Sequence, residues 1–120
     1  MRCQFGVPAS SVLPLSTCVI MEPLPLERIE AGLPACIADL APDHWAEAAE
    51  AIMTTDTVPK AISRQAVIDA RTVTVTGIAK GAGMIQPNMA TMLAVIATDA
   101  VVGQGALEDL VRHAAADCFN

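Results

Sequence analysis

The hydrophobic and polar positions of this chain repeat with helical spacing in two places. Apolar residues three and four positions apart predict a helix that packs one face in the core. The residues of that face are Trp45, Ala48, Ala49 and Ile52. A second stripe predicts a helix after Gly105, with Leu107, Leu110, Val111, Ala114 and Cys118 on one side.

Two other segments have the composition of strands. Val73, Val75 and Ile78 stand among threonines between residues 71 and 78, a pattern typical of a strand. The run from Met92 to Val102 is more continuously apolar, which predicts a strand buried on both faces. The first strand runs directly into a glycine-rich turn, so this turn is expected to lie between two strands.

The N-terminal third is less regular because prolines interrupt it. The apolar stretch 11–21 favours an extended, strand-like conformation. A helix is expected to begin at Pro25, but Gly32 and Pro34 break its apolar pattern. We therefore expect Pro34 to open a second short helix that ends at Leu40.

Composition limits the core and the ligands of the chain. Its 120 residues suffice for one small core, and 53% of them are hydrophobic but only 2% aromatic, so aliphatic side chains are expected to fill it. The net charge is −6 with scattered basic residues, which argues against nucleic acid or an anionic membrane as a partner. Small metabolites are the expected ligands.

The cysteines and histidines form no metal-binding pattern. The four cysteines are widely spaced without a CxxC pair, and the two histidines do not complete a finger, so no metal site is expected. The N-terminal residues lack the unbroken apolar core of an export signal, which predicts a cytoplasmic protein with buried free thiols. The run 92–102 is too short and too polar to span a membrane.

The segment Lys80–Leu93, KGAGMIQPNMATML, has the residues that a self-cleaving chain requires. Thr91 offers a hydroxyl, Ala90 is a small carbonyl neighbour, and the glycines and a Pro-Asn pair offer a tight turn. After cleavage, the new α-amine of Thr91 would titrate near neutral pH and could serve as base for its own hydroxyl. Most turns of this composition only reverse the chain, so an ordinary turn is the alternative.

The complete string resembles the processing site of the ornithine acetyltransferase family, also called bifunctional glutamate N-acetyltransferases. Further similar segments follow in the same order along the chain: LSTCVIMEPLP at 15–25, AIMTTDTVPK at 51–60, VTGIAKG at 75–81, and the final CFN. The resemblance implies an α/β fold, here part of a sandwich of stacked sheets with flanking helices, of the self-processing N-terminal-threonine type.

The resemblance also implies a reaction and an assembly. Cleavage between Ala90 and Thr91 would make 1–90 the end of an α chain and 91–120 the start of a β chain. Thr91 would then carry an acetyl group from N-acetylornithine to glutamate in arginine biosynthesis, with no bound cofactor. Whether acetyl-CoA also serves as a donor stays open. The cleaved chains are expected to assemble as a heterotetramer of two α and two β chains.

Four further positions match the family's site residues. The oxyanion-hole segment aligns with Thr17 and Cys18, and Thr57 and Lys80 match substrate-binding positions. Without the resemblance, Lys80 would be interpreted as a solvated surface lysine and Thr57 as an ordinary loop residue. Asp56 is expected to orient its neighbours and is given no catalytic role.

The chain departs from the family pattern near the oxyanion hole. Cys18 stands where glycine is usual, and Met21 stands where a second glycine often follows. A backbone N–H survives the change to cysteine, but a position that needs a positive φ would disfavour a β-carbon. Thr17 and Cys18 are then either a working hole or ordinary strand residues.

Two other functions remain open at this point. A related self-processing aminopeptidase or amidase would use water in place of glutamate as the acyl acceptor. A non-catalytic fragment is the third alternative, because family members are much longer on both sides of the region that this chain resembles. We expect the 120-residue chain to show little or no acetyl transfer by itself.

Overall fold

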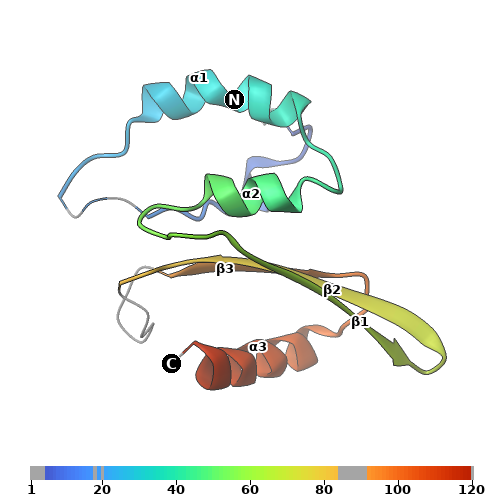
Figure 1. Cartoon of the computed structure of the whole chain (residues 1–120). Coiled ribbons are helices and arrows are strands. Elements are labelled where there is room, and N and C mark those ends of the chain that lie inside the picture. Colours follow the sequence, from blue (N-terminus) through green and yellow to red (C-terminus); the bar gives the residue numbers. More distant parts are fainter. Residues whose placement is uncertain (1–4, 18, 20, 84–91, 120) are drawn as a thin grey trace. The chain divides into compact units, whose positions relative to one another are not determined.

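The computed structural model describes residues 5–17, 19, 21–83 and 92–119 (Figure 1). The chain forms two compact units, Met1–His44 and Trp45–Asn120. Each unit has its own helices or strands. The second unit holds the sheet and most of the residues predicted to form the site.

The first unit contains a short 3₁₀ helix, η1 (Ala9–Ser11), and the helix α1 (Leu26–Ala38). The described residues of the stretch 11–21 form no strand, so the strand-like interpretation of that stretch was wrong for them. The prediction that Pro34 opens a second short helix was also wrong, because α1 continues through Pro34 without a break.

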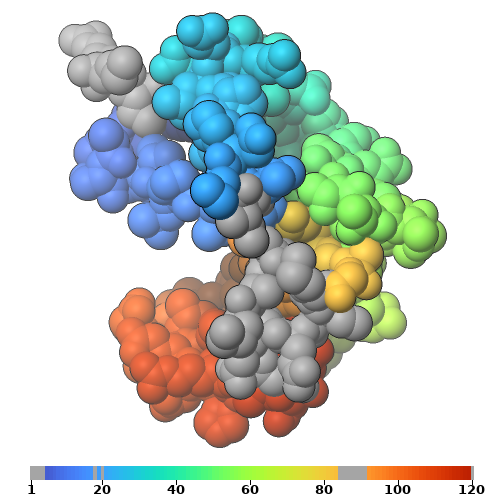
Figure 2. All heavy atoms as spheres, turned by 90° about the vertical axis from the view of Figure 1, so that its left-hand side faces the viewer, coloured from blue at the N-terminus to red at the C-terminus, as the bar shows by residue number. Residues whose placement is uncertain are grey.

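The exposure of α1 explains why it tolerates an internal proline. Pro34 has no N–H to offer the carbonyl oxygen one turn earlier. No residue of α1 is buried, and the space-filling view shows the helix (cyan) on the surface, so water can satisfy that oxygen (Figure 2). The apolar pattern predicted the helix, and the proline did not end it.

The second unit is built on a three-stranded antiparallel sheet. Its elements are α2 (Trp45–Ala51), β1 (Lys60–Ile68), β2 (Arg71–Lys80), β3 (Leu93–Thr98) and α3 (Gln104–Cys118). The strand order is β1-β2-β3, so β2 is central. Helix α2 packs against β1 and β2 (Figure 1). The predicted helices near residues 45 and 105 and the strands after residues 71 and 92 are confirmed.

Strand β1 was not predicted, and its turn explains why. It pairs with β2 from Lys60↔Ala79 to Ile68↔Arg71, which leaves only Asp69 and Ala70 in the turn. Both turn residues have positive φ, 49° and 62°. This is the geometry of a type I′ hairpin turn, which usually contains glycine. Because Asp-Ala lacks glycine, this turn carries no sequence signal of a hairpin.

Replacing Ala70 by glycine is expected to stabilise the hairpin. Ala70 has a φ of 62°, where a β-carbon costs about 1 kcal/mol and glycine costs little. The free energy of unfolding should therefore rise by roughly that amount in a denaturant titration of the protein expressed from its native locus. The control is Ala66→Gly inside β1, which should lower it by about 0.5–1 kcal/mol. Equal effects of the two changes would contradict the assignment of strain to the turn.

Burial in the second unit is concentrated where α2 covers the sheet. Ala49 of α2 and Ile78 of β2 are the buried apolar residues among those that the structure describes, with exposures of 0% and 6%. The prediction that Ala49 lies on the core-facing side of α2 is thus confirmed. The prediction that β3 is buried on both faces was wrong, because Val95 and Ile96 are 40% and 57% exposed. An apolar strand is buried only where another element covers it.

The two described thiols and the last helix are also more exposed than the sequence predicted. Cys36 and Cys118 are free but exposed, not buried. No residue of α3 is buried either, although its apolar stripe is present as predicted. Among the described residues, no helix has the length and apolar character needed to cross a bilayer.

The described residues therefore form a mixed α/β fold with one three-stranded antiparallel sheet and helices. The stacking of a second sheet and the self-processing N-terminal-threonine type stay predictions. The division of the chain into 1–90 and 91–120 also stays a prediction.

Candidate functional site

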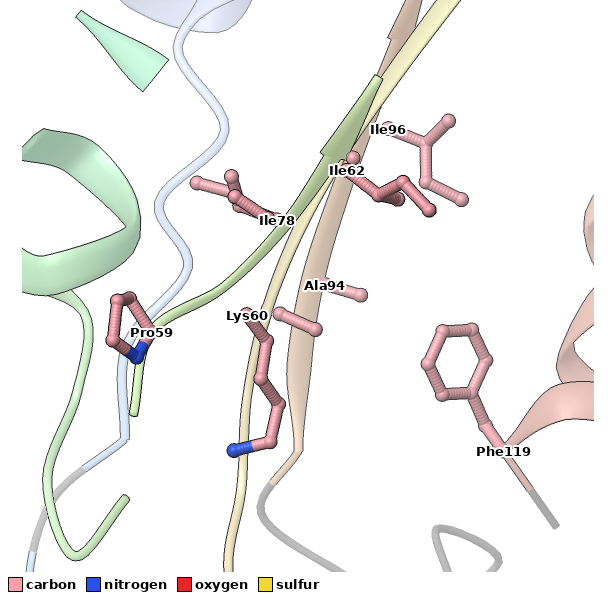
Figure 3. Close-up of a pocket in the computed structure, with 10 residues that line it drawn as sticks. Pro59, Lys60, Ile62, Ile78, Ala94, Ile96 and Phe119 are labelled. Atoms are coloured by element: carbon pink, nitrogen blue, oxygen red, sulfur yellow. The ribbon is translucent and has the colours of Figure 1, made fainter. Parts of the chain in front are cut away.

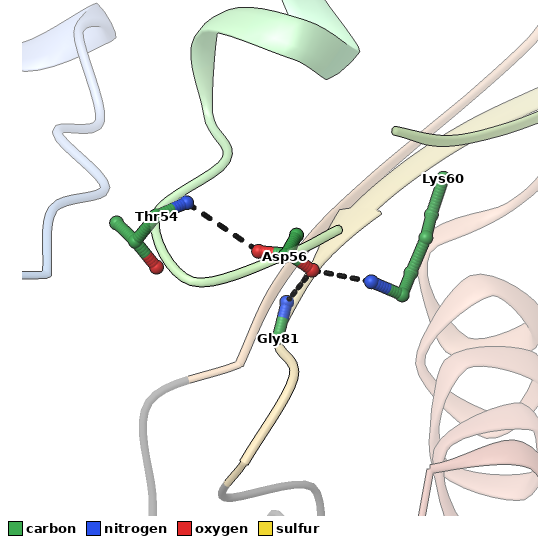
Figure 4. A network of polar contacts seen from close by, with 4 residues as sticks. All are labelled: Thr54, Asp56, Lys60 and Gly81. Atoms are coloured by element: carbon green, nitrogen blue, oxygen red, sulfur yellow. Dashed lines mark hydrogen bonds and ion pairs between the residues drawn. The ribbon is translucent and has the colours of Figure 1, made fainter. Parts of the chain in front are cut away.

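A shielded carboxylate links the loop after α2 to the end of β2. Asp56 lies in this loop, and its side chain is only 1% exposed. Its Oδ1 atom accepts the backbone N–H of Gly81 at 2.9 Å and pairs with the ammonium of Lys60, while Oδ2 accepts the N–H of Thr54 at 3.4 Å (Figure 4). Asp56 thereby joins two segments that lie 25 residues apart in the sequence.

These three donors keep Asp56 ionised. The hydrogen bond from Lys60 and then that from the backbone of Gly81 lower the pKa of Asp56 from 3.8 to about 2, against a smaller opposing effect of burial. A folded-state pKa below the unfolded value means that the stabilisation is fully present above pH 3.8 and is lost as the pH falls toward 2. The link is therefore charged throughout the neutral range.

The geometry of Gly81 is part of this link. Its φ is 146°, a backbone conformation that residues with a side chain rarely adopt. Gly81 follows the last residue of β2 directly, so its conformation sets how its N–H meets Asp56. The hydrogen bond from Gly81 to Asp56 thus explains why glycine stands at the first position of the predicted turn.

Lys80 and Thr57 lie on either side of the link. Lys80 is the last residue of β2 and is only 5% exposed, so the interpretation as a solvated surface lysine is corrected. It lies two residues after the buried Ile78, and alternation places both on the same face of the sheet. Thr57 is exposed and follows Asp56 directly. Asp56 thus ties the loop that carries Thr57 to the strand end that carries Lys80.

The structure describes only part of the predicted oxyanion hole. Thr17 is half-buried in the first unit, in a stretch without helix or strand, and Cys18 lies outside the described residues. Met21 has a φ of 69°. At such a φ a β-carbon costs about 1 kcal/mol relative to glycine, which explains why a glycine suits this position. The role of Thr17 and Cys18 stays a prediction.

The predicted nucleophile and cleavage bond, Thr91 and Ala90, also lie outside the described residues. The strands on either side of them are described. β2 ends at Lys80 and β3 begins at Leu93, and these two residues face each other in the antiparallel ladder. The segment with the predicted bond therefore connects two neighbouring strands.

A hollow next to the sheet has Lys60 of the link and Ile78 of β2 among its lining residues. It has a volume of about 390 Å³ and lies between the strands and Phe119, with Ile62, Ala94 and Ile96 pointing into it (Figure 3). Neither Thr57 nor Lys80 lines it. The part of the chain that the structure describes contains no group of three acidic, histidine or cysteine side chains arranged to hold a metal ion.

Comparison with known proteins agrees with the motifs. The family model described as "ArgJ family" matches residues 1–120, the whole chain. The chain belongs to the ArgJ family. A curated relative from Pseudomonas syringae pv. tomato, the arginine biosynthesis bifunctional protein ArgJ, is 63% identical over 115 residues. The match covers 96% of this chain but 28% of that protein, so the chain spans less than a third of its ArgJ relative.

Lys60 is the residue of this candidate site that the sequence pattern did not indicate. It stands four positions after Asp56 and forms the ion pair of the link. An acidic and a basic residue at that spacing are expected to meet on a helix, but this segment was interpreted as a loop. The pairing therefore had no reliable signal in the sequence.

Proposed function

We propose that this chain is part of an acetyltransferase of arginine biosynthesis that moves an acetyl group from N-acetylornithine to glutamate. The observation that carries the proposal is the link at Asp56, which ties the Thr57 loop to the strand end with Lys80. Membership of the ArgJ family and the name of the Pseudomonas syringae relative support the same reaction.

Thr91 is proposed to become the nucleophile by self-cleavage. Its hydroxyl oxygen attacks the carbonyl carbon of Ala90, the C–N bond breaks, and the hydroxyl proton passes to the departing nitrogen. Water then hydrolyses the resulting ester, which frees the Ala90 carboxylate and the Thr91 hydroxyl and amine. Strands β2 and β3 pair over six positions, from Val75↔Thr98 to Lys80↔Leu93, so this ladder can hold the two products together.

Acetyl transfer then takes place in two steps. The Thr91 hydroxyl, with its own amine as base, attacks the acetyl carbonyl of N-acetylornithine, and ornithine leaves with the proton on its amine. The amine of glutamate attacks the acetyl ester, which restores the hydroxyl and yields N-acetylglutamate. The backbone at Thr17 and Cys18 is proposed to donate to the oxyanion of both steps.

The buried ammonium of Lys80 is proposed to bind a substrate carboxylate, and the hydroxyl of exposed Thr57 to bind the acetylated substrate. No bound cofactor is needed for these steps, and acetyl-CoA is a candidate second donor. The proposal also includes a cytoplasmic heterotetramer of two α and two β chains.

Two measurements test this proposal on the protein expressed from its native locus. Intact-mass analysis should show two pieces, one ending at Ala90 and one starting at Thr91. Incubation with N-acetylornithine and glutamate should yield ornithine and N-acetylglutamate in equal amounts. Release of free acetate at the same rate without glutamate would instead identify an amidase, and a single uncleaved chain would refute self-processing. The 120-residue chain alone is expected to show little or no transfer.

A further inference from the structure

Asp56 connects the two predicted substrate-binding positions through its main chain on one side and its side chain on the other. It precedes Thr57 in the sequence, and its carboxylate accepts the N–H of Gly81, which follows Lys80. Any movement of Asp56 would therefore change the position of the Thr57 loop relative to the end of β2.

The contact has the properties of a rigid support. The Asp56 side chain is 1% exposed, and Oδ1 receives both the ammonium of Lys60 and the N–H of Gly81. Hydrogen bonds to a charged acceptor are stronger than neutral ones, so two of them on one oxygen fix the loop well. Lys60 itself is 44% exposed at the start of β1 and anchors the other end of the loop.

We propose that Asp56 is a positioning residue that sets the distance between Thr57 and Lys80 and thereby the affinity for the acetylated substrate. This inference rests on the proposed function, because it assigns Asp56 a role in that same site. Asp56 does not touch the reacting atoms in this role. It acts through the Gly81 backbone on one side and through its neighbour Thr57 on the other.

The test uses the protein expressed from its native locus and compares Asp56→Asn, Asp56→Ala and a matched control. The control is Asp99→Asn, because Asp99 also accepts a backbone N–H of β2, that of Thr74 at 2.8 Å, but outside the predicted site. The measured quantities are KM for N-acetylornithine, kcat for ornithine release and the midpoint of thermal unfolding.

We expect KM to rise about tenfold in Asp56→Asn, which loses the charge, and about 100-fold in Asp56→Ala, which also loses the acceptor. The value of kcat should change much less, because the nucleophile is untouched. Asp99→Asn should leave both constants unchanged. A merely structural role would lower the unfolding midpoint of the Asp56 and Asp99 variants alike without a selective rise in KM, and that result would overturn the inference.

Two further outcomes are separated by the design. If the wild-type protein shows no acetyl transfer, the proposed function itself is refuted. If the wild-type protein is active and Asp56→Asn has the same KM as the wild-type protein, only the role of Asp56 is refuted. Should neither Asp56 variant fold, Lys60→Met decides, since it removes the same ion pair from its half-exposed partner. An unchanged KM in that variant would also overturn the inference.

Discussion

Thr91→Ala is expected to leave a single uncleaved chain and to lower acetyl transfer by on the order of 10⁴-fold or more. The change removes the hydroxyl that is proposed to attack the Ala90 carbonyl, and an uncleaved chain has no α-amine at position 91 to act as base. Intact-mass analysis of the protein expressed from its native locus measures the first effect, and ornithine release from N-acetylornithine measures the second.

Thr91→Ser is the matched control for this prediction. Serine keeps the hydroxyl and, after cleavage, the α-amine, so cleavage and transfer should continue at a reduced rate. The prediction would be contradicted if Thr91→Ala were still cut after residue 90, because the cut would then come from another protease. Undiminished transfer by the alanine variant would show that a different residue carries the acetyl group.

Lys80→Met is expected to lower kcat/KM for N-acetylornithine by about 10- to 100-fold, mainly through KM. Methionine is similar in length but carries no charge, so it can fill the buried position at the end of β2 without binding a substrate carboxylate. Steady-state kinetics of ornithine release with varied N-acetylornithine measure the effect.

Arg71→Met is the control, because it removes the same charge from the other, exposed end of β2. It should leave kcat/KM within about twofold of the wild-type value, since an exposed charge far from the site is screened by salt. Equal losses in the two variants would indicate a general effect of net charge. An unchanged KM in Lys80→Met would remove Lys80 from the substrate site.

Periodicity predicted those elements whose local pattern is unambiguous. The helix α3 and the strands β2 and β3 each carry an apolar pattern of one period, and all three were found. Strand β1 was missed because the Asp69-Ala70 turn reaches positive φ without glycine. The prediction of a helix break at Pro34 was wrong because an exposed helix can leave one carbonyl oxygen hydrogen-bonded to water.

Burial was predicted less well than secondary structure. The sequence correctly indicated that Ala49 faces the core, because α2 lies on the sheet there. It did not indicate that Ile96 or the stripe of α3 would be exposed. An apolar pattern shows that a face favours burial, but whether another element covers that face depends on packing.

The sequence by itself determined the family of this chain. It also predicted a self-cleaving segment and the residues proposed to bind substrate. These follow from residue types and short-range order, which need no coordinates. Only the tertiary structure decided that Lys80 is buried and that Asp56 binds the amide of Gly81. That contact spans 25 residues and forms because the β1–β2 hairpin returns the chain to the loop after α2. No local pattern of side chains encodes such a return, since it depends on which strands pair and in which register.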